Sequence, residues 1–186
     1  MQIFDFKISE VSYNQPKFCS NATWNPNATT LANSSIIGSK PYAMYIDKNN
    51  TIYAASQETG QILIWSNDRI NPTTVLHANL YLPLSIFVTM NGDIYVGDNS
   101  SIQQVSYSNS SKLIIQMTSR CMGLFVDITN SIYCSSDPQH QVFKKWLGDN
   151  VSVMTTVAGT GSAGSAANQL SGPNGIFVDT NFDLYV

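Results

Sequence analysis

The chain has 186 residues, of which 43% are hydrophobic and only 11% are charged, and its formal net charge is −3. This composition excludes an intrinsically disordered chain and argues against nucleic acid as a partner, because neutralising phosphates requires a basic patch. No apolar run approaches the roughly 18 residues of a membrane-spanning helix, so we expect no membrane span. The N-terminal residues include Asp5, Lys7 and Glu10 and do not resemble a signal peptide.

The N-terminal part of the chain carries weak patterns. Residues 1–17 show no pattern that assigns them to an element. Within residues 18–33, Trp24 precedes a polar stretch and then Pro41, and the same order recurs after Trp65 and Trp146. This recurrence predicts extended outer strands in residues 18–33.

A twelve-residue phrase then occurs four times without a gap. The copies are AMYIDKNNTIYA from Ala43, SIFVTMNGDIYV from Ser85, GLFVDITNSIYC from Gly123 and GIFVDTNFDLYV from Gly175. Two short runs of β-branched and aromatic residues flank a three-residue polar turn, which predicts a β-hairpin. The Asp or Thr before each turn can bind the turn amides. Because the runs are apolar at consecutive positions, we expect each hairpin to be buried on both faces.

Further strand-like runs follow each of the first three phrases. They span residues 61–65 and 73–78, 101–107 and 112–117, and 141–146 and 153–159. The phrases begin 42, 38 and 52 residues apart. Repeats of about 40 to 50 residues built from four strands are typical of the blades of a β-propeller.

These motifs, together with an outer strand ending in Trp and the stretch TTVAGTGSAGSAANQLSGPNGIFVD, resemble the NHL-repeat β-propellers over residues 18–186. The resemblance implies an all-β fold, an incomplete propeller of four-stranded antiparallel blades with about three full blades and partial ones. The expected divisions are 18–40 (outer strands of a partial blade), 41–82, 83–120 and 121–172 (full blades), and 173–186 (the first hairpin of a truncated blade). Since NHL propellers normally have about six blades, we expect the chain to belong to a longer polypeptide and to be poorly stable alone.

Asn-x-Ser/Thr sequons indicate the compartment. Acceptors for N-glycosylation occur at Asn21, Asn27, Asn33, Asn49, Asn99, Asn109 and Asn150, whereas Asn71 precedes a proline and is excluded. Their density predicts an extracellular or secretory-pathway glycoprotein, although such residues are also ordinary polar turn formers.

The three cysteines, Cys19, Cys121 and Cys134, form no zinc-binding pattern. In an oxidising compartment Cys121 and Cys134 are a possible disulfide, because they bracket the third hairpin. With residues 128–130 as the turn, Cys134 lies opposite Leu124, so a bridge requires the chain to bend at residues 122–123. The alternative is a buried Cys134 and two free thiols elsewhere.

No catalytic, cofactor-binding or metal-binding residues are predicted. His77 and His140 are isolated, the glycine-rich stretch 158–164 lacks the Lys-Ser/Thr end of a phosphate loop, and the recurring Asp47, Asp127 and Asp179 fit turn architecture. Asp98 and Asp137, just after the tyrosine strands, are the acids most worth locating in a structure.

The sequence therefore favours a non-catalytic scaffold whose loops bind a protein or a glycan. Candidate loops are 57–60, 98–101 and 137–141. Two alternatives come from propellers that resemble this chain. One is a hydrolase or lyase with a metal in the central channel. The other is the substrate-recognition propeller of a RING-type ubiquitin ligase, whose zinc module has no counterpart in this sequence.

Overall fold

The structure, a computed structural model, describes residues 23, 27, 30–66, 69–149 and 153–186. Residues 1–17 and most of the outer strands predicted over 18–33 lie outside the described residues. The described residues 30–40 contain the short helix α1 (Ser34–Ile37), capped by the Asn33 side chain. This helix stands where the sequence analysis placed the end of a partial blade.

Three antiparallel four-stranded sheets follow in chain order, and we call them blades 1 to 3. Blade 1 comprises β1 (Pro41–Ile46), β2 (Ile52–Ser56), β3 (Ile62–Trp65) and β4 (Thr74–Leu76). Blade 2 comprises β5 (Ser85–Val88), β6 (Ile94–Gly97), β7 (Ser101–Val105) and β8 (Ser111–Gln116). Blade 3 comprises β9 (Gly123–Val126), β10 (Ser131–Ser136), β11 (Gln141–Trp146) and β12 (Thr155–Ala158).

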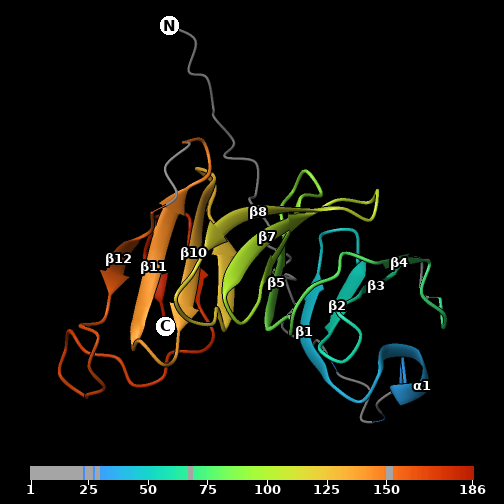
Figure 1. The fold of residues 1–186 in the computed structure, drawn as a ribbon, viewed down its shortest axis with the longest axis horizontal. Helices are drawn as coiled ribbons and strands as arrows, with labels where there is room; N and C mark the ends of the chain where they lie inside the picture. The colour runs from blue at the N-terminus through green and yellow to red at the C-terminus, as the bar shows by residue number, and fades with distance from the viewer. Residues whose placement is uncertain (1–22, 24–26, 28–29, 67–68, 150–152) are drawn as a thin grey trace, which may run out of the picture.

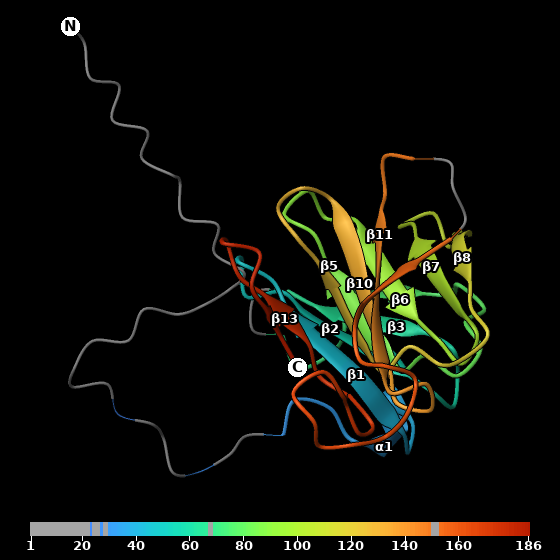
Figure 2. The same ribbon diagram turned by 90° about the vertical axis from the view of Figure 1, so that its left-hand side faces the viewer.

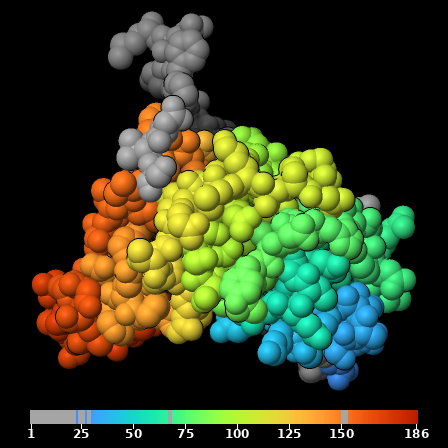
Figure 3. Space-filling model, in the orientation of Figure 1, coloured from blue at the N-terminus to red at the C-terminus, as the bar shows by residue number. Residues whose placement is uncertain are grey.

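The fourth phrase forms only a two-stranded sheet, hairpin 4, made of β13 (Phe177–Val178) and β14 (Leu184–Tyr185). Figures 1 and 3 show the blades side by side in chain order, from blue at one end of the molecule to red at the other. All the predicted strands of the three full blades form within a few residues of the predicted limits. The chain is thus an all-β partial propeller, as the sequence predicted.

The first strands of successive repeats lie next to one another and hold the fold together. β1 contacts β5, β5 contacts β9, and β9 contacts β13, which makes these the strands that link one blade to the next. Figure 2 shows the first strands β1, β5 and β13 toward one side of the molecule and the later strands β7 and β8 toward the other. The middle aromatic residue of each phrase, Tyr45, Phe87, Phe125 and Phe177, packs against the next, with ring centroids 5.1, 5.0 and 5.2 Å apart. Tilted and edge-on rings at such distances attract one another beyond the area that they bury.

The turns explain why the phrase is so regular. In the first hairpin the Asn50 amide donates to the Asp47 carbonyl and the Asp47 amide donates to the Thr51 carbonyl, each at 3.0 Å. Such a three-residue turn ends on a left-handed residue. That position is held by Asn50, Gly92, Asn130 and Phe182, with φ of 59°, 87°, 67° and 68°. Asn and Gly tolerate this conformation, whereas Phe182 is an unusual occupant.

Burial on both faces is confirmed for the middle hairpins and wrong at the two ends. Every residue of β5, β6, β9 and β10 is buried. In β1, by contrast, Tyr42 and Met44 are exposed, and in β14 Tyr185 is exposed. The reason is that blades 2 and 3 have a neighbouring sheet on both sides, whereas blade 1 and hairpin 4 each have a described sheet on one side only.

Cys121 and Cys134 form a disulfide, with their Cα atoms 5.5 Å apart and both side chains buried. Cys134 pairs with Leu124 in the register, as predicted. Cys121 occupies the place that Pro41, Pro83 and Pro173 hold before the other hairpins. The bridge therefore joins the entry of blade 3 to its second strand. The alternative of a buried, unbridged Cys134 with a free thiol at Cys121 is wrong.

Candidate functional site

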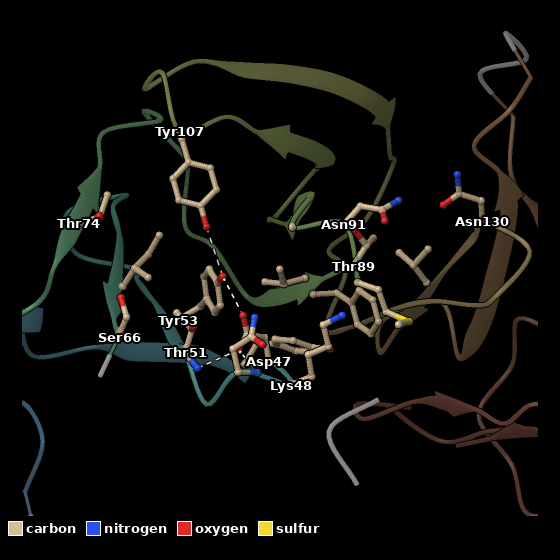
Figure 4. Close-up of a pocket in the computed structure, with 18 of the residues that line it drawn as sticks. Asp47, Lys48, Thr51, Tyr53, Ser66, Thr74, Thr89, Asn91, Tyr107 and Asn130 are labelled. Carbon is tan, nitrogen blue, oxygen red and sulfur yellow. Dashed lines mark hydrogen bonds between the residues drawn. The ribbon is translucent and has the colours of Figure 1, made fainter. Parts of the chain in front are cut away.

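A pocket of about 620 Å³ opens at the edge of the blades where the hairpin turns lie. We call it the turn-edge pocket. Its walls come from the turns after β1, β5 and β9 and from the loops after β3 and β7, so all three blades contribute (Figure 4). Its lining combines aromatic rings, aliphatic side chains, amides and hydroxyls with two carboxylates and one lysine. The aromatic residues are Tyr45, Tyr53, Phe87 and Tyr107; the aliphatic residues and Met are Ile64, Val88, Met90, Val126 and Ile128; the amides and hydroxyls are Asn49, Asn91, Asn130, Thr51, Ser66, Thr74 and Thr89; and the charged residues are Asp47, Asp127 and Lys48.

A hydrogen-bonded chain of side chains stands on one wall of this pocket. The Tyr53 hydroxyl donates to Asp47 Oδ2 at 3.3 Å, and it therefore accepts from the Tyr107 hydroxyl, also at 3.3 Å. Figure 4 shows Tyr107 reaching down from its loop to Tyr53, with Asp47 below. Tyr107 lines the pocket and is 54% exposed, so its side chain is accessible from solvent.

The pKa values of two tyrosines of the pocket, Tyr45 and Tyr53, are raised. Burial and, to a smaller extent, the Asp47 charge raise the pKa of Tyr45 to about 12. Burial raises the pKa of Tyr53 further, followed by its hydrogen bond to Tyr107 and the nearby Asp47 carboxylate. Both phenols are neutral at physiological pH, so they act as hydrogen-bonding groups and not as bases.

The carboxylates of the pocket serve the turns. Asp47 Oδ1 accepts from the amides of Asn49 and Thr51, both at 2.8 Å. Asp127 Oδ1 accepts from the amides of Thr129 and Ser131, both at 2.9 Å. These contacts confirm the predicted turn role of the recurring Asp. A second role was not predicted: Oδ2 of Asp47, Asp127 and Asp179 accepts from the tyrosine six residues later, although the spacing is visible in the repeat.

The loops that the sequence analysis selected lie at the opposite edge of the blades, because each follows the second strand of a blade whose strands alternate in direction. Their polar groups bind the protein itself. Glu58 accepts from the Ser39 amide and hydroxyl at 2.7 and 2.8 Å. Asp98 is buried and accepts from the backbone amides of Ser100 and Ser101, from the Ser101 hydroxyl and from the Gln103 side-chain amide. Asp137 forms a two-pronged ion pair with Arg120. The pocket thus lies at the edge that the sequence analysis did not choose.

The histidines are also engaged within the chain. His140 Nδ1 accepts from the Gly172 amide at 3.0 Å, and the His77 ring pairs with the Gln61 amide at 3.0 Å. Across the described ranges, no three His, Cys, Asp or Glu side chains come together as metal ligands would. No helix in the part of the chain that the structure describes is long and apolar enough to span a membrane.

Five of the seven predicted glycosylation acceptors lie in the described residues, and all five are exposed: Asn27, Asn33, Asn49, Asn99 and Asn109. Asn21 and Asn150 lie outside the described residues. Asn49 lines the turn-edge pocket, so a glycan on Asn49 would border the pocket. The side-chain oxygen of Asn109 accepts a hydrogen bond from the His77 backbone amide. Their modification stays a prediction.

No family model matches the chain, and no curated protein matches it. Solved structures do. Virginiamycin B lyase from Staphylococcus aureus matches with a TM-score of 0.58 at 10% identity, over 78% of this chain and 47% of that one. A streptogramin B lyase matches with a TM-score of 0.60 at 12% identity, over 81% of this chain and 48% of that one.

Hydrazine synthase from Kuenenia stuttgartiensis matches with a TM-score of 0.60 at 15% identity, over 82% of this chain and 42% of that one. The extracellular domain of BT3049 from B. thetaiotaomicron matches with a TM-score of 0.54 at 12% identity, over 82% of this chain and 21% of that one. This chain therefore spans less than half the length of these structures. At such identities the likeness establishes the propeller fold and not an activity, and the NHL family stays a resemblance.

Proposed function

We propose that the protein is a non-catalytic, NHL-type propeller scaffold that binds a glycan in the turn-edge pocket. The observation that carries the proposal is the lining of that pocket, which combines aromatic and aliphatic side chains with amides and hydroxyls, and in which Lys48 is the one cation among the described lining residues. Carbohydrates present apolar C–H faces and many hydroxyls, so aromatic faces and uncharged polar groups match them. Pockets of 300 to 1,000 Å³ hold small ligands, and this volume suits a short oligosaccharide.

The electrostatics of the pocket support binding and not catalysis. Its acids are occupied by backbone amides and tyrosine hydroxyls, and Tyr45 and Tyr53 stay protonated at physiological pH. A general base needs a pKa near the working pH and a free site for the proton. The neighbouring Tyr107 and Asn91 instead provide a ring face and an amide on two sides of the pocket (Figure 4).

An extracellular or secretory location belongs to the same proposal. It is supported by the Cys121–Cys134 disulfide, since disulfides persist in oxidising compartments, and by the exposure of the described sequon asparagines. Both features also fit the glycoprotein character that we predict. The location is testable by expression in eukaryotic cells followed by glycosidase treatment and mass analysis of the full chain.

Glycan-array screening followed by calorimetry tests the binding proposal. We expect Tyr107→Ala and Asn91→Ala each to weaken binding of an array hit by about tenfold, which corresponds to about 1.4 kcal/mol. Tyr81→Ala removes an equally exposed tyrosine outside the pocket and should leave affinity unchanged. Absence of any glycan hit, or equal effects of Tyr107→Ala and Tyr81→Ala, contradicts the proposal; binding to a protein that Tyr107→Ala abolishes would reassign the pocket to a protein ligand.

A further inference from the structure

A second pocket, of about 510 Å³, lies beside the turn-edge pocket, and we call it the outer pocket. It is formed by the turn after β5, the end of β7 and the turn that leads into β8, so the described residues that line it all belong to blade 2. Blade 2 has a described sheet on each side, because β5 contacts both β1 and β9. The outer pocket therefore does not depend on what adjoins either end of the blade series.

The two pockets adjoin one another. Asn91, Gly92 and Tyr107 line both of them, and Figure 4 shows Tyr107 and Asn91 on two sides of the turn-edge pocket. A Cβ added at Gly92 would meet no atom within 4 Å, whereas Asn50 and Asn130 carry a side chain at the same place of their turns. Blade 2 thus leaves open space where the two pockets meet, and an extended ligand can pass from one to the other.

The carboxylates of both pockets are already engaged by the protein. Asp47 and Asp127 accept from the amides of their turns and from tyrosine hydroxyls. In the outer pocket, Asp93 Oδ1 accepts from the Gln104 side-chain amide at 3.1 Å, and Asp93 Oδ2 accepts from the Thr89 hydroxyl at 3.4 Å. Each carboxylate oxygen has at least one donor in the protein, so these acids are poorly available to a ligand.

The lysines of the two pockets have no such partners. Lys48 lines the turn-edge pocket, Lys112 lines the outer pocket, and both are exposed. Within the part of the chain that the structure describes, neither ammonium group has an ion-pair partner or a hydrogen-bond acceptor. Lys144 also offsets the charge of Asp127, whose Oδ2 lies 3.8 Å from its Nζ. Occupied carboxylates beside unpaired ammonium groups favour a ligand that brings its own negative charge.

We propose that the two pockets form one groove for a carboxylated oligosaccharide, which places one carboxylate at Lys48 and another at Lys112 and crosses the Tyr107 ring between them. This inference rests on the proposed glycan binding and narrows it to chains that contain uronic or sialic acid units. The hydroxyls of Ser106 and Ser111 line the outer pocket and suit the neutral hydroxyls of such a chain. A chain that reaches both lysines is longer than one that fills the turn-edge pocket alone, so affinity rises with chain length.

Calorimetry of the full chain with uronic-acid oligosaccharides and with sialylated oligosaccharides, each in graded lengths, tests the proposal. The matched ligand control is the carboxyl-reduced form of each, which has the same length and no charge. We expect the acidic forms of one series to bind about tenfold more tightly than the reduced forms, as two exposed ion pairs allow. Added salt should remove most of this difference. Comparison of the two series shows which kind of acidic sugar is the source of the carboxylate.

Variants assign the charge and the passage to residues. Lys48→Gln and Lys112→Gln should each weaken binding of the long acidic oligosaccharide about fivefold and leave the reduced form unaffected. Lys40→Gln removes an exposed lysine outside both pockets and should change nothing. Gly92→Asn keeps the turn, because Asn50 holds the same place with φ of 59°. It should weaken binding of long oligosaccharides and not of short ones.

The outcomes separate this inference from the proposed function. If the reduced and acidic forms bind equally, or if affinity does not depend on chain length, the acidic groove is wrong and glycan binding stands. The same holds if Lys112→Gln and Lys40→Gln have equal effects. If neither series binds in any form and a glycan array also gives no hit, the proposed function fails together with the inference.

Discussion

Asp127 and Asp179 perform the same task in two environments. Each carboxylate accepts from two amides of its own turn and from the tyrosine six residues later. Asp127 is buried and lies 3.8 Å from Lys144 Nζ, whereas the bonds of Asp179 are at the surface. A hydrogen bond that becomes unsatisfied costs more in the interior, because water cannot replace the lost partner.

We therefore predict that Asp127→Ala lowers the free energy of unfolding by about 2 to 4 kcal/mol, since two amides, the hydroxyls of Thr129 and Tyr133 and a partly buried ammonium group lose their partner. Asp179→Ala, the matched control, should cost about 1 kcal/mol or less. Urea unfolding followed by circular dichroism measures both. Equal losses for the two variants would show that burial of the turn carboxylate does not set its contribution.

The left-handed residue of each turn shows a limit of residue-level prediction. The sequence displays Asn50, Gly92 and Asn130 at this position, which are the residues that the conformation favours. Phe182 has the same positive φ without that preference, and only the repeat alignment predicts it. A residue's place in the repeat is here stronger evidence than its own propensity.

At the scale of elements, blade 3 differs from its neighbours in how its first strand is fixed. Where the other hairpins are entered through a proline, blade 3 is entered through Cys121, which is bonded to Cys134 thirteen residues later. Cys121 also lies close enough to the preceding blade to restrict a residue there. A side chain on Gly97 of β6 would place its Cβ 2.8 Å from Cβ of Cys121, so a glycine is required there.

We predict that the double variant Cys121→Ala/Cys134→Ala is less stable by about 3 kcal/mol, the chain-entropy contribution of a disulfide closing a loop of this length. Alanine suits the second position, because Ala54 holds it in blade 1. Thermal unfolding measures the loss. A reducing agent should lower the Tm of the native chain and leave that of the variant unchanged, and an unaffected native chain would contradict the prediction.

At the scale of the whole molecule, each repeat contributes one aromatic ring to a series that runs from blade to blade: Tyr45, Phe87, Phe125 and Phe177. Among these four residues, Tyr45 alone has a hydroxyl. It stands beside Tyr53, and both belong to the cluster between blades 1 and 2. Burial keeps these phenols neutral, so their ionisation and the packing of the blades are coupled.

The coupling predicts loss of stability in alkali. The pKa of Tyr45 is about 12 in the folded chain against about 10 when unfolded, and burial also raises the pKa of Tyr53, Tyr95 and Tyr133. The folded chain holds these phenolic protons more tightly than the unfolded chain does. The neutral phenols therefore make their full contribution to the stability of the fold below pH 10, and this contribution falls as the pH rises from 10 towards 12.

Circular dichroism and phenolate absorbance recorded together against pH measure this loss, and we expect them to change in one transition. Tyr45→Phe, which copies the residue of the other three phrases, should shift the transition to higher pH. Ionisation of all tyrosines near pH 10 with the fold intact would contradict the coupling.

The sequence by itself determined the repeating unit: its hairpins, its outer strands, the role of the recurring Asp and the register that places Cys134 opposite Leu124. These follow from local alternation, turn chemistry and period, which are properties of neighbouring residues. Stacking of the blades is also implicit there, because strands buried on two faces need neighbours on both sides.

Only the tertiary structure decided where the pocket lies and which faces stay open. The turn-edge pocket combines turns about 40 residues apart in the chain, and no local pattern reports how side chains from three blades converge. Met44 and Ile86 look equivalent in sequence, and Tyr185 matches Tyr53, yet their exposure differs because burial depends on what packs against a face and not on the residue that it carries.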